Sequence, residues 1–215
     1  MRITVQAQAK INWALDILSR REDGYHEMDM LMQKIALSDE IRFETARWTT
    51  LTVNGHLIAN AGKNLIVRAA NLLNEYMGEK RGVRITLSKR IPVRAGLGGG
   101  SADCAAALMA LNDLWGFKLP AKTLKKLALS LGADVPYCME NDFCRVRGIG
   151  EDVQTLENAP KIPLVVACVS PGLSTQAVFS NFDEAGDSPL NVPMEKLCGR
   201  LTAGDFRAAD EISGN

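Results

Sequence analysis

A glycine-rich stretch at residues 91–102 constrains the fold more than any other feature of the chain. It carries four glycines in the five positions from Gly96 to Gly100, and it joins a strand pattern to a helix pattern. Because glycine lacks a Cβ and reaches positive φ, successive backbone amides of such a loop can point into one concavity. Unpaired amides at the start of the following helix would add donors for an anion. The stretch therefore predicts a phosphate-binding loop between a strand and a helix.

Two familiar nucleotide-binding motifs do not fit this loop. The P-loop needs Lys followed by Ser or Thr directly after its last glycine, whereas Ser101 and Ala102 follow here. The dinucleotide-binding fingerprint needs glycines at positions 96, 98 and 101, and position 101 is serine. A loop that serves only as a tight connector remains an alternative, although its glycine density favours phosphate binding.

Alternating apolar residues predict that the first part of the chain is rich in strands. The alternation over residues 3–7 indicates a half-buried strand, which we expect to place Lys10 and Asn12 just beyond its end. A second strand pattern covers residues 28–35. Residues 49–58 contain an Asn-Gly pair between apolar alternations, which predicts a two-residue hairpin turn.

Helical spacing of apolar residues follows further along the chain. It predicts helices over residues 65–76, from about 101 to 115, and over 121–131, with a strand at 83–87 before the glycine loop. A continuous apolar run at 164–169 predicts a buried strand.

Strands and helices mix without a regular βαβα rhythm, which favours the α+β fold class, with a mixed β-sheet and helices in the first domain. Pro160 and Pro163 bracket a change of pattern, so residues 155–163 are the expected domain seam. We expect an N-terminal domain at 1–157 and a second structural unit at 158–215.

The balance of charge excludes a strongly basic or acidic protein. The chain has 215 residues with 25 Lys plus Arg and 25 Asp plus Glu, so we expect no nucleic-acid partner. No apolar run reaches the ~18 residues that a membrane span needs, so we expect no membrane partner. Five scattered cysteines predict buried, reduced thiols and hence a cytoplasmic protein.

Four motifs, in this order, give the chain a family resemblance. They lie at residues 9–12 (Ala-Lys-Ile-Asn), 21–26 (Arg-Glu-Asp-Gly-Tyr-His), 92–107 (the glycine loop and helix start) and 131–136 (Leu-Gly-Ala-Asp-Val-Pro). Together they resemble the GHMP kinases, and most closely the branch that phosphorylates the 2-hydroxyl of a cytidine-diphosphate-linked sugar alcohol in the non-mevalonate route to isoprenoid precursors. The resemblance implies an ATP-dependent kinase with a two-domain fold whose C-terminal domain is ferredoxin-like.

The resemblance implies catalytic roles for Lys10 and Asp134. Asp134 would accept or orient the proton of the substrate hydroxyl, and Lys10 would neutralise the charge that builds on the transferred phosphoryl group. Taken alone, Asp134 would be read as a solvated turn residue and Lys10 as a surface lysine. Their occurrence together with the glycine loop favours the catalytic interpretation.

The resemblance also implies two binding sites beside this pair. The implied ATP-binding residues are Pro92, Gly96, Leu97, Gly98, Gly99, Gly100, Ser101, Ala102, Asn64 and Lys89. The implied substrate-binding residues are Asn12, Tyr25, His26, Thr175 and Phe179. Asn64 could equally cap the helix that follows it, and Thr175 and Phe179 could belong to the core of the second domain. We expect Mg²⁺ to accompany ATP, and no metal site made by the protein, because no residues have dedicated metal-ligand spacing.

Some features depart from the family pattern. A further glycine-rich motif is expected beyond residue 215, so we expect the second domain to be incomplete in this sequence. Asn141 and Asp142 stand where a glycine pair is usual, and Arg145 and Arg147 follow them in a strand whose residues are usually apolar or small. Two other functions remain as alternatives: another small-molecule kinase of the GHMP family, or a catalytically impaired fragment that binds nucleotide or substrate.

Overall fold

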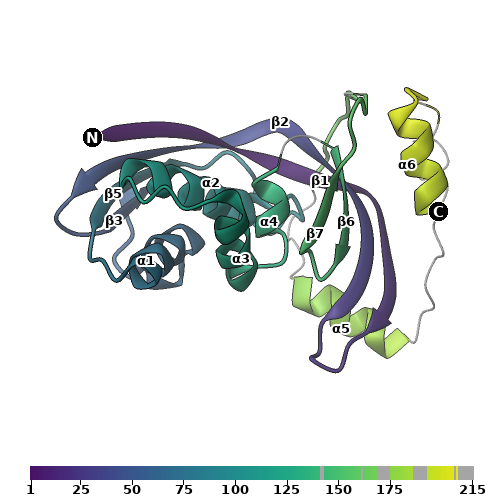
Figure 1. The fold of residues 1–215 in the computed structure, drawn as a ribbon, viewed down its shortest axis with the longest axis horizontal. Coiled ribbons are helices and arrows are strands. Elements are labelled where there is room, and N and C mark those ends of the chain that lie inside the picture. The colour runs from purple at the N-terminus through teal and green to yellow at the C-terminus, as the bar shows by residue number, and fades with distance from the viewer. Residues whose placement is uncertain (141–142, 161, 169–174, 186–192, 206, 208–215) are drawn as a thin grey trace.

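The computed structural model describes residues 1–140, 143–160, 162–168, 175–185, 193–205 and 207. Within these residues, seven strands form one mixed sheet (Figure 1). The strands are β1 (Arg2–Arg20), β2 (His26–Ala46), β3 (Thr50–Val53), β4 (His56–Leu57), β5 (Gly82–Ser88), β6 (Phe143–Gly148) and β7 (Asp152–Thr155). The helices are α1 (Leu65–Met77), α2 (Gly99–Leu114), α3 (Ala121–Leu131), α4 (Val135–Cys138), α5 (Thr175–Ala185) and α6 (Met194–Thr202), with a short 3₁₀ turn at Ala61–Lys63. Mixed sheet and helices together confirm the predicted α+β class.

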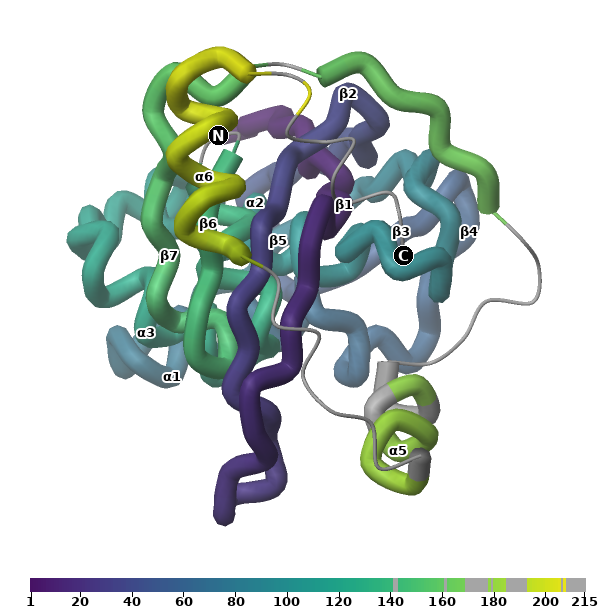
Figure 2. Tube along the Cα trace, turned by 90° about the vertical axis from the view of Figure 1, so that its right-hand side faces the viewer, coloured from purple at the N-terminus to yellow at the C-terminus, as the bar shows by residue number. Residues whose placement is uncertain are grey.

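Strand β2 is central to the sheet because three other strands pair with it. On one side, β1 runs antiparallel to it for almost its whole length. On the other side, β6 pairs with residues 28–33 and β5 pairs with residues 40–46. Strand β3 then adds to β5 in parallel, and β7 adds to β6. The β1–β2 hairpin extends beyond the rest of the sheet, beside α5 (Figures 1 and 2).

The two faces of β2 carry separate hydrophobic cores, because alternate residues of a strand point to opposite faces. Met30 and Met32 belong to the main core, which includes residues of α1, α2, α3 and α4. Leu31, between them, packs with Phe143 and with one face of α6. Figure 2 shows α6 crossing the side of β2 opposite to α1 and α3. None of the described helices is both long and apolar enough to cross a lipid bilayer.

The first strand is longer than its alternation predicts. It continues through Lys10 and Asn12, which therefore lie within β1 and not beyond it. Gln8 pairs with Ser38, whereas Lys10 pairs with Lys34, so three residues of β2 face the single residue between Gln8 and Lys10. This bulge interrupts the alternation, which hides the rest of the strand from a period-2 pattern.

Most other predicted elements are confirmed. The Asn-Gly hairpin turn joins β3 to β4 with positive φ at both residues, and β5 covers the predicted strand. Helix α1 ends at Gly78, and α3 spans the predicted residues 121–131. Helix α2 begins at Gly99, two residues earlier than predicted, because the glycines themselves form its first turn.

The predicted buried strand at 164–169 is wrong over the part that is described. Residues 164–168 form no strand, and Val165 is 98% exposed. None of the described strands pairs with this segment, and an extended segment without a partner cannot complete a hydrogen-bond ladder. Position 169 lies outside the described residues. The domain boundary between residues 157 and 158 stays a prediction.

The cysteines partly follow the expectation. Within the described residues none of the five forms a disulfide, and Cys104, Cys138, Cys144 and Cys198 are buried. Cys168 is exposed and lies, like Val165, in the segment outside the sheet.

Arg145 of β6 connects the sheet to α6. Its guanidinium donates to both carboxylate oxygens of the buried Asp29 on β2, at 3.0 and 2.8 Å, and also pairs with Glu195 at the start of α6. The hydrogen bonds to Asp29 and Glu195 raise the pKa of Arg145 above its usual value. This contact gives a structural reason for arginine at position 145, where a small or apolar residue was expected.

We predict that Arg145→Met lowers the free energy of unfolding by about 2–4 kcal/mol, because it leaves the Asp29 carboxylate buried without its cation. Denaturant titration measures this value. The matched control is Arg147→Met on the same strand, whose ion pair with Asp152 is about half exposed. That control is expected to cost no more than about 1 kcal/mol. Equal losses for the two variants would contradict the prediction.

Candidate active site

The glycine loop opens helix α2 with its backbone amides available to a ligand. Gly96 has φ 74° and Gly98 has φ 65°, both in the left-handed region that glycine adopts without strain. Gly98 is the N-cap, and no side chain of the described residues caps the helix. The amides of the first turn therefore lack partners within the helix and can bind an anion.

Lys10 of β1 passes directly over Gly98. A Cβ at position 98 would lie 2.8 Å from Cγ of Lys10 and 3.1 Å from its Cε. The backbone amide of Lys10 donates to the carbonyl of Leu97 at 3.0 Å. Glycine at position 98 is thus required twice, for its φ and for the close approach of the lysine stem.

The ammonium of Lys10 reaches Asp134, the N-cap residue of α4. Their Nζ and Oδ2 atoms are 3.4 Å apart, and Lys10 also donates to Oδ1 of Asn12 at 3.2 Å. The lysine side chain is 8% exposed and the aspartate side chain 34% exposed. A mostly buried cation therefore holds a carboxylate that solvent and ligands can still reach.

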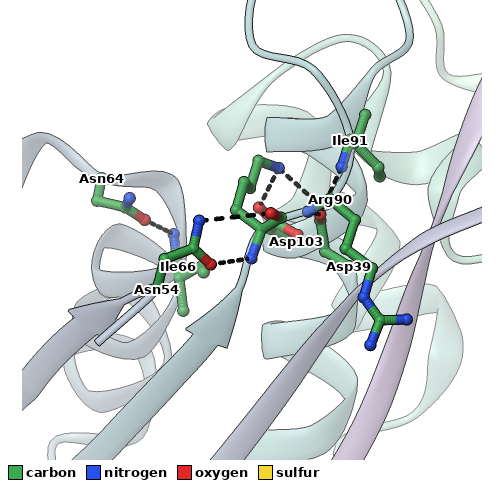
Figure 3. A network of polar contacts seen from close by, with 8 residues as sticks. Asp39, Asn54, Asn64, Ile66, Arg90, Ile91 and Asp103 are labelled. Carbon is green, nitrogen blue, oxygen red and sulfur yellow. Dashed lines mark hydrogen bonds and ion pairs between the residues drawn. The ribbon is translucent and has the colours of Figure 1, made fainter. Parts of the chain in front are cut away.

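A second set of charges lies beneath the loop (Figure 3). The ammonium of Lys89, at the end of β5, pairs with the fully buried Asp39 of β2 and, at 2.8 Å, with Asp103 of α2. Asp39 also accepts the backbone amide of Ile91 at 2.8 Å. These bonds tie β2, the start of the glycine loop and the first turns of α2 together.

Asp103 is the less satisfied of the two carboxylates. Its Oδ1 is buried and has no hydrogen-bond partner among the described residues. Burial raises the pKa of Asp103 to about 7, the charge of Lys89 opposes this shift, and the charge of Asp39 adds to it. The two carboxylates therefore share one ammonium, and Asp103 is a member of the cluster that takes up a proton near neutral pH.

A cavity of about 1400 Å³ joins these features. One end is formed by the glycine loop with Asn64 and Lys89, and the middle by Lys10, Asn12 and Asp134. The rest of its wall is largely apolar. This apolar part includes Leu15, Ile17, Met28, Met30, Val178 and Phe182. The cavity thus offers an anion site, a lysine–carboxylate pair and an apolar wall in contact with one another.

Comparison with known proteins assigns the family. The model of the GHMP kinase N-terminal domain matches residues 64–141. A 4-diphosphocytidyl-2-C-methyl-D-erythritol kinase of Pelotomaculum thermopropionicum is 42% identical over 217 residues, which cover 100% of this chain and 75% of that relative. The chain belongs to this family of GHMP kinases. A relative of the same name from Caldanaerobacter subterraneus is 40% identical over 89% of this chain and 66% of its own length.

Solved structures agree with this assignment. A 4-(cytidine 5'-diphospho)-2C-methyl-D-erythritol kinase superposes with a TM-score of 0.70 at 32% identity, covering 98% of this chain and 77% of that chain. A mevalonate pyrophosphate decarboxylase from Streptococcus pyogenes reaches 0.72 at only 13% identity, which shows a shared fold and nothing more. The chain spans about two thirds of the length of the first two curated relatives, 66% of each.

The structure brings most of the predicted site residues of this kinase family together. Among the predicted ATP-binding residues, only Ala102 is absent from the cavity wall, because it is buried in the helix core. Asn64 lines the cavity and also caps α1, since its Oδ1 accepts the amide of Ile66 at 2.9 Å. Asn64 can therefore cap the helix and also face a ligand in the cavity, because the cap uses only its side-chain oxygen. The binding roles themselves stay predictions.

Tyr25 and His26 lie apart from the cavity, at the tip of the β1–β2 hairpin. Tyr25 is 56% exposed. His26 is buried, and its Nε2 lies 2.8 Å from Oδ1 of Asp183 on α5. Neither is part of the cavity wall, so their predicted contact with a cytosine base stays a prediction.

The two predicted substrate residues of α5 cannot be placed. Thr175 and Phe179 fall within the helix, but their side chains lie outside the described residues. Two other residues of α5, Val178 and Phe182, do line the cavity. The helix therefore borders the site.

Sequence reasoning missed the buried carboxylates Asp39 and Asp103. One signal was present for Asp103, which is a charged residue inside the alanine-rich, otherwise buried start of α2. Such a residue needs a buried partner. No sequence signal marks Asp39 as its neighbour, because position 39 lies far away on β2.

We predict that Gly98→Ala destabilises the fold more than Gly96→Ala. Both residues have positive φ, but a Cβ at position 96 meets nothing within 4 Å, whereas one at 98 collides with Lys10. The expected losses in free energy of unfolding are about 1 kcal/mol at position 96 and roughly twice that at 98. Denaturant titration of the two variants checks this difference, and equal values would contradict it.

We also predict that Asp103 makes stability depend on pH. Its pKa is about 7 in the folded chain and near 3.8 when unfolded. Between these values the folded state holds a proton that the unfolded state releases, so this group lowers the free energy of unfolding as pH rises from about 4 to 7. Asp103→Asn should therefore gain stability relative to the natural chain across that window, by at most about 1.4 kcal/mol per pH unit.

The control for this measurement is Asp113→Asn, on the exposed face of the same helix. It should keep the pH slope of the natural chain. A slope that is also unchanged in Asp103→Asn would refute the assignment.

Proposed function

We propose that this chain carries out the ATP-dependent phosphorylation of the 2-hydroxyl of 4-diphosphocytidyl-2-C-methyl-D-erythritol. The observation that carries the proposal is the Lys10–Asp134 pair, 3.4 Å apart, on the wall of the same cavity as the glycine loop. The names of relatives at about 40% identity support the choice of substrate. Phosphoryl transfer needs an anion site next to a group that activates an alcohol, and we assign these two roles to the glycine loop and to Asp134 on the wall of this cavity.

The glycine loop would bind the phosphates of ATP through its amides. The first-turn amides at Gly99, Gly100 and Ser101 require no positive side chain, which agrees with a chain of no net charge. Lys10 passes over Gly98 and ends beside Asp134, so its ammonium would lie between the terminal phosphate and the acceptor alcohol. There it would stabilise negative charge on the transferred phosphoryl group.

Asp134 would orient the substrate hydroxyl and accept its proton. Its carboxylate is one-third exposed to the cavity, while its neighbour Lys10 is nearly buried. A fixed cation beside a reachable carboxylate holds that carboxylate in one orientation. Asn12 also accepts a hydrogen bond from the same ammonium, which limits the positions that Lys10 can adopt.

The apolar wall between this pair and the hairpin tip would hold the rest of the substrate. Leu15 and Ile17 come from β1, Met28 and Met30 from β2, and Phe182 from α5. Tyr25 and His26 lie at the far end of the same two strands. The proposed cytidine position is therefore at the end of the cavity away from the glycine loop.

Magnesium would arrive with the nucleotide. The described residues contain no group of three or more His, Cys, Asp or Glu side chains that could hold a metal ion. Magnesium commonly keeps several waters and binds substrate phosphates with few protein ligands, so we propose an ion that is held mainly by the phosphates of ATP. The ion would neutralise phosphate charge. The cytoplasm is the proposed location, because four of the five cysteine thiols are buried.

We predict that Asp134→Asn and Lys10→Met each lower kcat by about 10²–10⁴-fold, because each removes half of the pair at the reacting atoms. A coupled assay for ADP with the cytidine-diphosphate substrate measures the loss. Asp113→Asn is the control for an exposed carboxylate and should keep the natural rate.

Three outcomes would replace the proposal. Turnover of a mevalonate but not of the cytidine-diphosphate substrate would assign a different GHMP kinase. Binding of an inert ATP analogue without any turnover would indicate a binding fragment. Turnover that survives in Asp134→Asn would exclude the proposed role of the carboxylate.

A further inference from the structure

We propose that Lys34 is a positioning residue for Asp134, acting through the short helix α4. The inference rests on the proposed function, because it concerns the carboxylate that would orient the acceptor alcohol. Lys34 is not part of the cavity wall, so it would act from behind the site and not on a ligand.

The sheet places Lys34 next to Lys10. The two residues are direct partners across the antiparallel β1–β2 pair, so their side chains leave the same face of the sheet. Two ammonium groups at such a pair would repel each other unless both met negative charge. Lys10 meets the carboxylate of Asp134 at one end of α4, and Lys34 meets two backbone carbonyls, which carry partial negative charge, at the other end.

The two lysines hold opposite ends of the same four-residue helix. Lys10 lies 3.4 Å from the carboxylate of Asp134, the residue directly before α4. Lys34 donates to the carbonyl of Cys138 at 3.0 Å and to the carbonyl of Glu140. The helix between them is only Val135–Cys138.

A helix of one turn cannot hold its own geometry, because its first hydrogen bond fixes several residues at once. Here the amide of Cys138 donates to the carbonyl of Asp134 at 3.1 Å. The carbonyl of Cys138 in turn accepts from Lys34. A direct chain of contacts thus leads from Lys34 to the backbone of Asp134.

The pKa of the Cys138 thiol is affected by the charged groups at both ends of the helix. Burial raises the pKa of its thiol to about 12, the charge of Asp134 adds to the shift, and the charges of Lys34 and Lys10 oppose it. One further contact, from Lys125 of α3 to the carboxylate of Glu140, holds the same end of α4 by a side chain. Removing Lys125 therefore provides a matched control that leaves the two carbonyl contacts in place.

The test compares Lys34→Met with Lys125→Met in the complete chain. Without the two hydrogen bonds from Lys34, α4 should shift and move Asp134 from its position. A displacement of about 1 Å can cost about 10²-fold in rate. We expect Lys34→Met to lower kcat by about 10–100-fold while KM for ATP stays within about twofold. Lys34→Arg, which can still donate to both carbonyls, should recover most of the rate. Lys125→Met should keep kcat within about threefold.

A double-mutant comparison separates positioning from general damage. In an Asp134→Asn background, Lys34→Met should have no further effect on kcat, because its action depends on the carboxylate. The inference would be overturned if Lys34→Met lowered kcat equally in the natural chain and in Asp134→Asn, or if it left kcat unchanged. A rise in KM for ATP in place of the fall in kcat would overturn it as well. If Lys34→Met fails to fold, Lys34→Gln, which is shorter and uncharged but keeps a donor group, takes its place, and a smaller loss of kcat in the same direction is then expected.

Hydrogen exchange tests the same claim without turnover. Lys34→Met should speed exchange of the amides in residues 135–140 by at least about tenfold, while amides of residues 102–110 in α2 keep their rates. If the natural chain turns over no substrate, the proposed function fails, yet faster exchange confined to α4 still supports the role of Lys34. If the natural chain is active and exchange at α4 does not change, the inference fails alone.

Discussion

The close passage of Lys10 over Gly98 is the contact on which the rest of the site depends. It requires a residue without a Cβ, because a Cβ at position 98 would lie 2.8 Å from Cγ of the lysine. It also requires β1 and the glycine loop to be held together, which the Lys10–Leu97 backbone hydrogen bond achieves. Because the lysine then ends beside Asp134, three segments that are far apart in sequence meet at one cavity. In the proposed function, this one side chain connects the phosphate-binding loop to the carboxylate that would activate the alcohol.

Ion pairs between largely buried side chains surround that contact. Lys89 with Asp39 and Asp103 lies beneath the loop, and Lys10 with Asp134 lies beside it. Each of these two ammonium groups pairs with at least one carboxylate, so the side chains are held in place without a strong net charge. Burying such groups costs free energy unless every partner is present. Asp103 lacks one such partner, because its Oδ1 makes no hydrogen bond among the described residues. Burial raises the pKa of the same carboxyl group.

Much of the fold could be predicted, but in uneven ways. Helix α3 and the Asn-Gly hairpin were predicted closely, because local turn and capping residues specify them. The bulge beside Lys10 was not, since register depends on which strand pairs with β1. The apolar run at 164–168 misled the prediction because hydrophobicity alone does not supply a neighbouring strand. Within the site, the loop and the Lys10–Asp134 pair were expected, whereas Asp39, Asp103 and Lys34 were not.

The sequence by itself determined which chemical groups are available: a loop that can bind phosphate, a lysine, a carboxylate, and motifs in an order typical of GHMP kinases. Only the tertiary structure decided which charges lie together. It set Lys34 opposite Lys10, placed Asp39 under Lys89, and turned His26 toward Asp183. The physical reason is that local propensities act over a few residues, whereas ion pairs form between strands and helices that only the packed core brings within reach.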